Sequence, residues 1–98
     1  MFLPDSFRFD WDRANLDLLA RRRVTASEIE QLFANDPYGV AYDMSGGEER
    51  WTAMGHTSNL RVLLVVWTVR EGAIRALGSR EAVAANREIY LTARGFER

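Results

Sequence analysis

The chain lacks cysteine and lysine entirely, and histidine occurs once among its 98 residues. Without cysteine, a disulfide framework, a thiolate zinc site and a cysteine nucleophile are all excluded. No apolar run approaches the roughly 18 residues that a membrane helix needs, and the longest, Val62 to Trp67, has the length of a strand. The first residues show no basic segment followed by a long apolar one, so no secretory signal is expected. We therefore expect a cytoplasmic protein without a membrane span.

An excess of charge of one sign is also lacking, because thirteen arginines face fourteen acidic residues and leave a net charge of -1. This balance argues against a general nucleic-acid coat protein. The exclusive use of arginine has two explanations. A genome rich in G and C favours arginine codons over lysine codons, and arginine also presents a planar fork that binds phosphate through two hydrogen bonds. The positions of the arginines must decide between these explanations.

The N-terminal third predicts a short strand followed by two helices. Residues 8–11 alternate polar and apolar side chains as a strand does, and Asp12 is a suitable N-cap for a helix over about residues 13–22. Thr25 and Glu28 have the spacing of a capping box, which starts a second helix. The turn-forming sequence NDPYG ends that helix.

From residue 40 onward the hydrophobic period changes to two. Strands are predicted over 40–44, 50–56, 60–69 and 73–77, and the short breaks between them favour an antiparallel meander. The third strand is apolar at both parities, which predicts a central position covered on both faces. Ser79 is placed to cap a last helix over about residues 80–93, with Gly95 as its stop. We expect one α+β domain over residues 1–98, with two N-terminal helices and a C-terminal helix packed on a small antiparallel sheet.

Several segments, in order and with consistent spacing, resemble one protein family. They are FDWDRAN (9–15), RRRVTASEIEQLF (21–33), ERWTAMGHT (49–57), RVLLVVWT (61–68) and IRALGSREA (74–82), followed by Arg87 and Tyr90. Together they resemble the BrnT family of bacterial toxins. The resemblance implies a RelE-like fold and a metal-independent endoribonuclease that acts on RNA to block translation, with no cofactor. It also implies a BrnA-like ribbon-helix-helix antitoxin as partner, and it allows a homodimer within the toxin–antitoxin complex.

The chain departs from the family pattern at the arginine run. Relatives usually read KHGV or RHGV where this chain reads RRRV, so a histidine and a glycine are replaced by Arg22 and Arg23. Some relatives also carry a histidine where Leu18 stands. If a histidine in the first helix takes part in the chemistry, this protein lacks it. A second hypothesis is therefore a catalytically degenerate member that keeps antitoxin or other protein binding. A third is a small module that inhibits another protein, as some RelE-like relatives inhibit a topoisomerase.

Metal-independent RNA cleavage needs a proton acceptor for the ribose 2′-hydroxyl, cations for the phosphate and a donor for the leaving oxygen. Arginine supplies the cation but stays protonated. The candidate catalytic arginines are Arg61 and Arg75 on strands and Arg80 at the start of the last helix, all at basic positions of the family pattern. Equally, they could be surface arginines paired with glutamates. The spacing of the acidic residues near the N-terminus matches no metal-ligand motif, so no metal site is expected.

His56 and Tyr90 are the candidates for proton transfer. The unperturbed pKa of a histidine, about 6.5, suits a general acid or base, and we expect His56 to be accessible at a strand end. Tyr90 could donate a proton or stack on a base, or it could simply pack in the core. Arg22 and Arg23 either complement the C-terminal end of the first helix or contact RNA or the antitoxin. Trp51, if exposed, could join such an interface.

Overall fold

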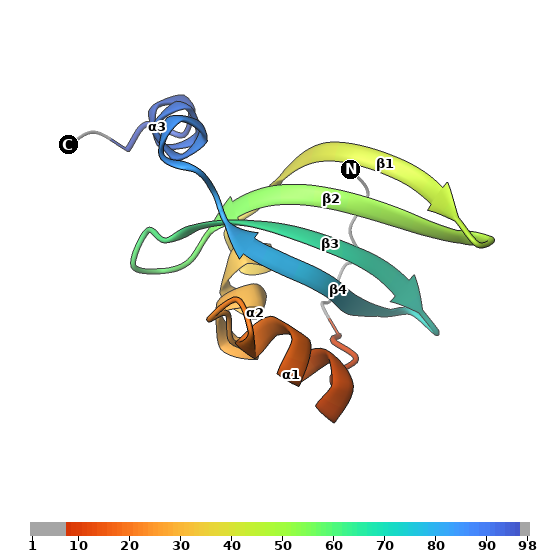
Figure 1. Cartoon of the computed structure of the whole chain (residues 1–98). Helices are drawn as coiled ribbons and strands as arrows, with labels where there is room; N and C mark the ends of the chain where they lie inside the picture. Colours follow the sequence, from red (N-terminus) through yellow and green to blue (C-terminus); the bar gives the residue numbers. More distant parts are fainter. Residues whose placement is uncertain (1–7, 97–98) are drawn as a thin grey trace.

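The computed structural model describes residues 8–96, which form three helices and four strands (Figure 1). The elements are α1 (Arg13–Ala20), α2 (Ala26–Ala34), β1 (Tyr38–Ser45), β2 (Glu48–His56), β3 (Val62–Arg70), β4 (Ala73–Glu81) and α3 (Ala84–Ala93). The strands form one antiparallel sheet in the order β1-β2-β3-β4. α1 and α2 lie together on one side of the sheet, and α3 stands apart from them near one end of the strands (Figure 1). The predicted α+β class, meander and placement of helices along the chain are confirmed.

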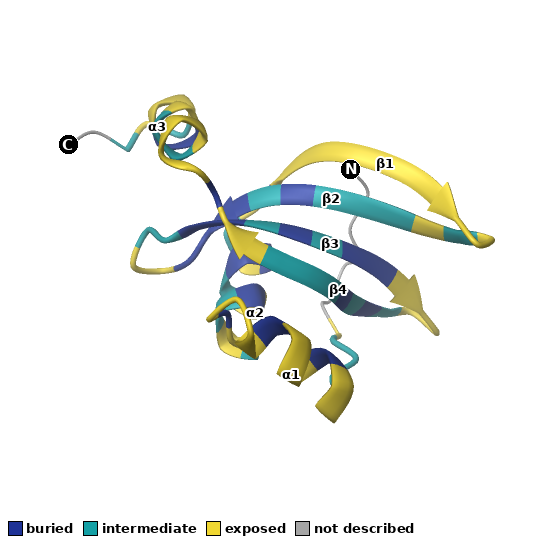
Figure 2. Ribbon diagram, in the orientation of Figure 1, coloured by how far each residue is buried: buried dark blue, intermediate teal, exposed yellow. Residues whose placement is uncertain are grey.

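The core lies between the sheet and the two N-terminal helices. On β3, Leu63, Val65 and Trp67 face these helices and are almost completely buried, in one cluster with Leu19 of α1 and Ile29 of α2. Burying one such side chain contributes about 1.5–3 kcal/mol, so this cluster dominates the stability of the domain. Figure 2 shows the buried residues concentrated on β3 and the sheet-facing sides of the helices, whereas β1 is exposed along its whole length. No described helix is long and apolar enough to cross a bilayer.

Capping boxes fix the starts of α1 and α2. The sequence predicts the N-cap Asp12 and the Thr25–Glu28 box, whereas the part that Asn15 plays in the first box is seen only in the structure. The Asn15 N–H donates to the Asp12 carboxylate at 2.9 Å, and the Asp12 N–H donates to the side-chain oxygen of Asn15 at 2.8 Å. Thr25 and Glu28 exchange the same pair of hydrogen bonds at the start of α2. Each capping side chain contributes about 1 kcal/mol. The two boxes therefore set where the chain enters each helix, with a five-residue connection left between the helices.

α1 ends two residues before its predicted boundary, because the chain turns within the arginine run. Arg23 adopts the left-handed conformation, with φ at 59°. Its N–H donates to the Ala20 carbonyl, and the Val24 N–H donates to the Leu19 carbonyl. This pair of hydrogen bonds is the Schellman arrangement, whose left-handed position is usually glycine because other residues are strained there. Arg23 thus occupies the position at which the family pattern has glycine.

Two predicted elements differ from the structure. The N-terminal strand is reduced to one isolated bridge between Phe9 and Ile74. β4 is longer than predicted, so the last helix begins at Ala84 rather than at residue 80. Ser79 is not a helix cap, since it lies within β4 and its hydroxyl donates to the Leu64 carbonyl at 2.6 Å. Pairing with β3 continues through this segment, and its hydrogen bonds outweigh the local capping signal.

A buried pair of side chains, His56 on β2 and Tyr90 on α3, anchors α3 to the sheet. Nδ1 of His56 lies 2.7 Å from the Tyr90 hydroxyl oxygen, and the two residues are 7% and 2% exposed. The expectation of an accessible His56 is wrong, because α3 and the ring of Phe96 cover this end of the strand. Burial, reinforced by the positive charge of Arg94, lowers the pKa of His56 below its ordinary value.

Replacing Arg23 with glycine should raise the free energy of unfolding by about 1 kcal/mol, because glycine removes the left-handed strain. The carbonyl of residue 23, which accepts a hydrogen bond from Arg61, is retained in the variant. Urea unfolding followed by circular dichroism measures the difference. Arg22→Gly is the matched control: the φ of Arg22 is not positive, so this substitution should bring no gain. Equal effects of the two substitutions would contradict the assignment of strain to Arg23.

The fold should lose stability through His56 as the pH falls below about 6.5, the ordinary pKa of histidine. The pKa of His56 is lower in the folded protein than its ordinary value of 6.5, so the unfolded chain binds more protons below that pH. This contribution is complete above about pH 6.5 and is lost as the pH falls toward the folded pKa. His56→Gln keeps a polar partner for Tyr90 and should flatten this part of the curve of melting temperature against pH. A slope that persists in the variant would assign the pH dependence to other groups.

Candidate functional site

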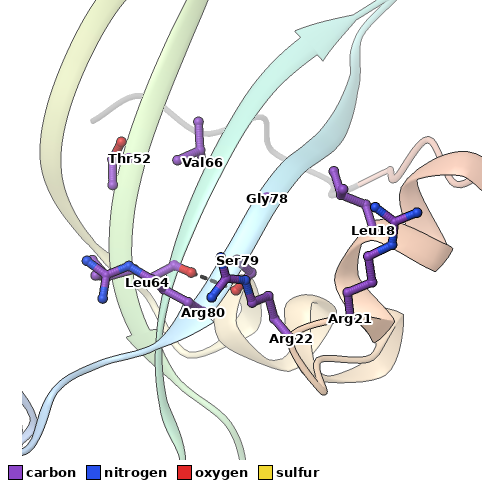
Figure 3. A pocket seen from close by; sticks show the side chains of 9 residues that line it. All are labelled: Leu18, Arg21, Arg22, Thr52, Leu64, Val66, Gly78, Ser79 and Arg80. Carbon is purple, nitrogen blue, oxygen red and sulfur yellow. Dashed lines mark hydrogen bonds between the residues drawn. The ribbon is translucent and has the colours of Figure 1, made fainter.

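A pocket of about 520 Å³ opens where β4, at one edge of the sheet, passes the C-terminal end of α1. One wall comes from β2, β3 and β4, and the other from α1 and the turn that follows it (Figure 3). The lining residues are Leu18, Arg21, Arg22, Thr52, Leu64, Val66, Gly78, Ser79 and Arg80. The pocket therefore joins aliphatic side chains with three guanidinium groups.

The pocket exists because the edge strand β4 is irregular. Its pairing with β3 changes register between Val66 and Trp67, which leaves Leu77 outside the paired positions, next to Gly78. Such a bulge bends the strand and changes the direction of its side chains. Gly78 has no side chain, and a Cβ placed on it would meet no atom within 4 Å. The hollow can thus run across β4 at Gly78 and connect the sheet face with α1.

Three arginines surround the pocket without counter-ions. Arg21 and Arg22 follow directly after α1, and Arg80 projects from β4 (Figure 3). All three residues are exposed, and within residues 8–96 none of their side chains has an ion-pair partner. Positive charges gathered around one hollow attract an anion, and the planar fork of guanidinium fits phosphate in particular.

The floor of the pocket is aliphatic and open. Leu64 and Val66 alternate along β3 with the buried core residues, so they project from the opposite face of the sheet. The prediction that β3 is covered on both faces is wrong here: both residues are partly exposed, and α3 covers only the end of β3 near Val62. On the α1 side, Leu18 is 43% exposed. Apolar walls with a few convergent polar groups are typical of ligand pockets.

Arg61 lies outside this lining and fastens three elements together. Its Nη1 donates to the two carboxylate oxygens of Glu28 at 3.0 and 2.8 Å and to the Arg23 carbonyl at 2.7 Å. A carboxylate oxygen of Glu81 lies 3.6 Å from its Nη2. The hydrogen bonding with Glu28 raises the pKa of Arg61 further above its ordinary value. This guanidinium therefore holds the turn after α1 against α2 and β4.

Arg75 has a similar structural engagement. Its Nη2 lies 2.9 Å from an Asp12 carboxylate oxygen and its Nη1 lies 3.4 Å from one of Asp10, and the side chain is only 12% exposed. These ion pairs join the segment before α1 to β4. Catalytic roles for Arg61 and Arg75 remain predictions, because a phosphate would have to displace the carboxylates that now occupy both side chains.

The other predicted residues also lie outside the pocket lining, except Arg22 and Arg80. His56 and Tyr90, the two candidates for proton transfer, contact each other where α3 packs on the end of β2. Trp51 is partly buried and stacks on Trp67 in the core, with ring centroids 4.9 Å apart. The structure thus separates the proton-transfer candidates from the unpaired arginines.

The lining can bind an anion, but it carries no proton acceptor that titrates near neutral pH. Its nine residues include no histidine, aspartate, glutamate, lysine or tyrosine, and the hydroxyl of Ser79 is engaged by the Leu64 carbonyl. Among the described residues, no group of three or more histidine, cysteine, aspartate or glutamate side chains is arranged to hold a metal ion. The arrangement can neutralise phosphate charge and seat an apolar group beside it.

Sequence reasoning missed seven of the nine lining residues, namely Leu18, Arg21, Thr52, Leu64, Val66, Gly78 and Ser79. One of them carried a usable signal, because Arg21 opens the arginine run at a helix end. Gly78 gave none, since it lies just after the strand predicted over 73–77. The others could not be found, because their exposure depends on β4 being an edge strand and on α3 covering only one end of β3.

Comparison with known proteins identifies a family. No curated protein matches the chain. The sequence model of a family described as ribonuclease toxin, BrnT, of type II toxin-antitoxin system matches residues 11–86. The matched region includes α1, α2, the whole sheet and all nine residues of the pocket lining, and it ends before Tyr90. The chain therefore belongs to the BrnT family of ribonuclease toxins of type II toxin–antitoxin systems.

Proposed function

We propose that this toxin is a metal-independent endoribonuclease whose cleavage of RNA blocks translation and growth, and that its substrate phosphate binds at the pocket beside β4. The observation that supports this placement is the group of three unpaired arginines, Arg21, Arg22 and Arg80, around one hollow. In contrast, Arg61, Arg70 and Arg75 are ion-paired, so carboxylates occupy their guanidinium groups.

In the proposed reaction the ribose 2′-hydroxyl gives its proton to water and its oxygen bonds to the adjacent phosphorus. The P–O5′ bond breaks, and the 5′-oxygen leaves with a proton from water. Negative charge accumulates on the phosphate oxygens during this exchange. Fixed donors at that point usually supply the largest part of catalysis, and the loss of one costs about 10²–10³-fold in rate. Arg80 is carried by a strand, whereas Arg21 and Arg22 are carried by a helix end and a turn. We therefore assign Arg80 the main role in stabilising the transition state.

Arg21, Arg22 and Arg80 form the rim of the pocket, and their positive charge supports cleavage without a metal. A divalent cation is repelled by three guanidinium groups, and the lining offers it no carboxylate or imidazole ligand. Phosphate, in contrast, meets both charge and hydrogen-bond donors there.

As partner we propose a BrnA-like ribbon-helix-helix antitoxin that silences the toxin by covering the arginine rim, with any toxin homodimer confined to that complex. Type II toxins are held inactive by a protein antitoxin, and the family match implies such a partner together with an RNA target. An acidic segment of the antitoxin would supply the counter-ions that Arg21, Arg22 and Arg80 lack within the described chain.

A second candidate function is a catalytically degenerate toxin that keeps antitoxin or other protein binding. The observation that favours it is the absence of a proton acceptor in the lining, together with the burial of His56 and Tyr90. In strains that express the protein, the first candidate predicts cleavage of cellular RNA, whereas the second predicts intact RNA.

Arg80→Ala should reduce toxicity and RNA cleavage by at least about 100-fold, because it removes a donor that acts on the transition state. The measurement is growth of a bacterium that expresses the intact protein from a tightly regulated promoter, with RNA integrity followed in the same cultures. Arg13→Ala is the matched control, since Arg13 is an exposed arginine at the other end of α1 and outside the pocket lining.

Growth arrest with RNA cleavage in the wild type and the control, but not in Arg80→Ala at equal soluble yield, supports the proposal. An Arg80→Ala strain that cleaves RNA as the wild type does would remove Arg80 from the site. Arrest with intact RNA would favour action on another protein, and unimpaired growth of the wild type would favour the degenerate toxin.

Cleavage by the purified protein should be unchanged by a chelator such as EDTA, because phosphate charge is neutralised by guanidinium groups. The rate on a labelled oligoribonucleotide is measured with and without EDTA at constant ionic strength. A loss of rate that added Mg²⁺ restores would overturn the metal-independent reaction.

A further inference from the structure

The part of the pocket that lies open beside Gly78 is called the notch. We propose that it is a binding subsite for one unpaired nucleobase of the RNA, next to the phosphate position at Arg21, Arg22 and Arg80. The inference deepens the proposed function and rests on it for the identity of the ligand. It names the class of substrate as single-stranded RNA whose base can leave its stack and enter the pocket.

The first argument is the chemistry of the lining. A phosphate alone would need only the guanidinium groups, yet the hollow beside them is lined by Leu18, Leu64 and Val66, together with Thr52. An aliphatic wall gains free energy by covering the flat face of a base. A nucleotide combines an apolar face with an anionic phosphate, which matches the two halves of this pocket.

The second argument is the form of the edge strand. Gly78 lies where the lining passes from the sheet face to α1, and the space above it is empty, since a Cβ there has no neighbour within 4 Å. Any larger residue would project into this space and separate the two walls. The pocket has a volume of about 520 Å³, within the range of pockets that hold small molecules.

The third argument is access. β4 is the outer strand of the sheet, and the segment before α1 pairs with it only near its start, at Ile74. An edge strand presents backbone N–H and C=O groups outward. A base seated at Gly78 would lie against this edge, where such groups can read its hydrogen-bonding edge. A paired base cannot enter in this way, because its own edge is already occupied.

The test is to fill the notch and to measure binding separately from cleavage. The variant is Gly78→Leu. The φ of Gly78 is not positive and its Cβ meets nothing, so the backbone can carry leucine. The probes are a fluorescent single-stranded oligoribonucleotide with 2′-O-methyl groups, which blocks attack by the 2′-hydroxyl, and an abasic oligonucleotide with the same backbone. Dissociation constants are measured by fluorescence anisotropy.

We expect the wild type to bind the base-bearing oligonucleotide about tenfold more tightly than the abasic one. Gly78→Leu should lose this difference and bind the abasic oligonucleotide as the wild type does. Ala41→Leu is the control, because it adds the same side chain at an exposed position of β1 that does not line the pocket. Should Gly78→Leu fail to fold, Leu18→Ala removes an exposed wall residue and should reduce the same difference.

Gly78→Leu that folds and still prefers the base-bearing oligonucleotide overturns the base subsite. Equal weakening of both oligonucleotides also overturns it, since that result shows obstruction of the phosphate path alone. Cleavage of unmodified RNA is assayed separately. A base preference that depends on Gly78, in a protein that does not cleave RNA, would keep the subsite and reject the catalytic part of the proposed function.

Discussion

The guanidinium of Arg61 is the interaction on which the geometry of the pocket depends. It stands just before β3 and binds the capping glutamate of α2, the carbonyl of Arg23 in the turn after α1, and a carboxylate on β4. Together with the segment of Arg61 itself, these three contacts join four separate parts of the chain. Because Arg21 and Arg22 immediately precede that carbonyl, the same contacts set the distance between the arginine run and β4. The paired arginine thus determines where the unpaired ones stand.

The arginines near the pocket therefore fall into two groups, those that are paired with carboxylates and those that are not. Arg61 and Arg75 are partly buried and hold carboxylates, so their charge contributes to the fold. Arg21, Arg22 and Arg80 are exposed and keep their charge available. Exposed ion pairs contribute little stability, whereas a partly buried guanidinium left without its carboxylate is costly. Position within the fold, and not the number of arginines, therefore separates structural charge from binding charge.

The class of the fold and the starts of both N-terminal helices were predictable because their signals are local. The Asp12 N-cap, the Thr25 capping box, the change of hydrophobic period from residue 40 onward and the turns between strands all act over a few residues. The end of β4 was not predictable, since Ser79 satisfies a local capping pattern but is paired with β3 in the sheet. The burial of His56 was missed for a similar reason: Tyr90 of α3 lies 34 residues further along the chain and covers it only after the chain has folded.

The pocket was predictable only in part. Arg22 and Arg80 were chosen because arginine suits phosphate, and both line the hollow. Arg61 and Arg75 were chosen by the same rule and are paired with carboxylates. Residue type states what a side chain can do, while its neighbours decide whether it is free to do it. The aliphatic floor gave no signal, because Leu64 and Val66 read as core residues in an apolar strand.

A rim made only of guanidinium groups has a consequence for control of the toxin. Guanidinium does not lose its proton at any pH that a cell reaches, and the lining contains no cysteine that could be oxidised. The lining itself therefore offers no group that acidity or redox state would switch. Under the proposed covering of the rim by an antitoxin, the open fraction of the pocket would depend on the ratio of the two proteins, and so on the relative rates at which the two polypeptides are made and destroyed.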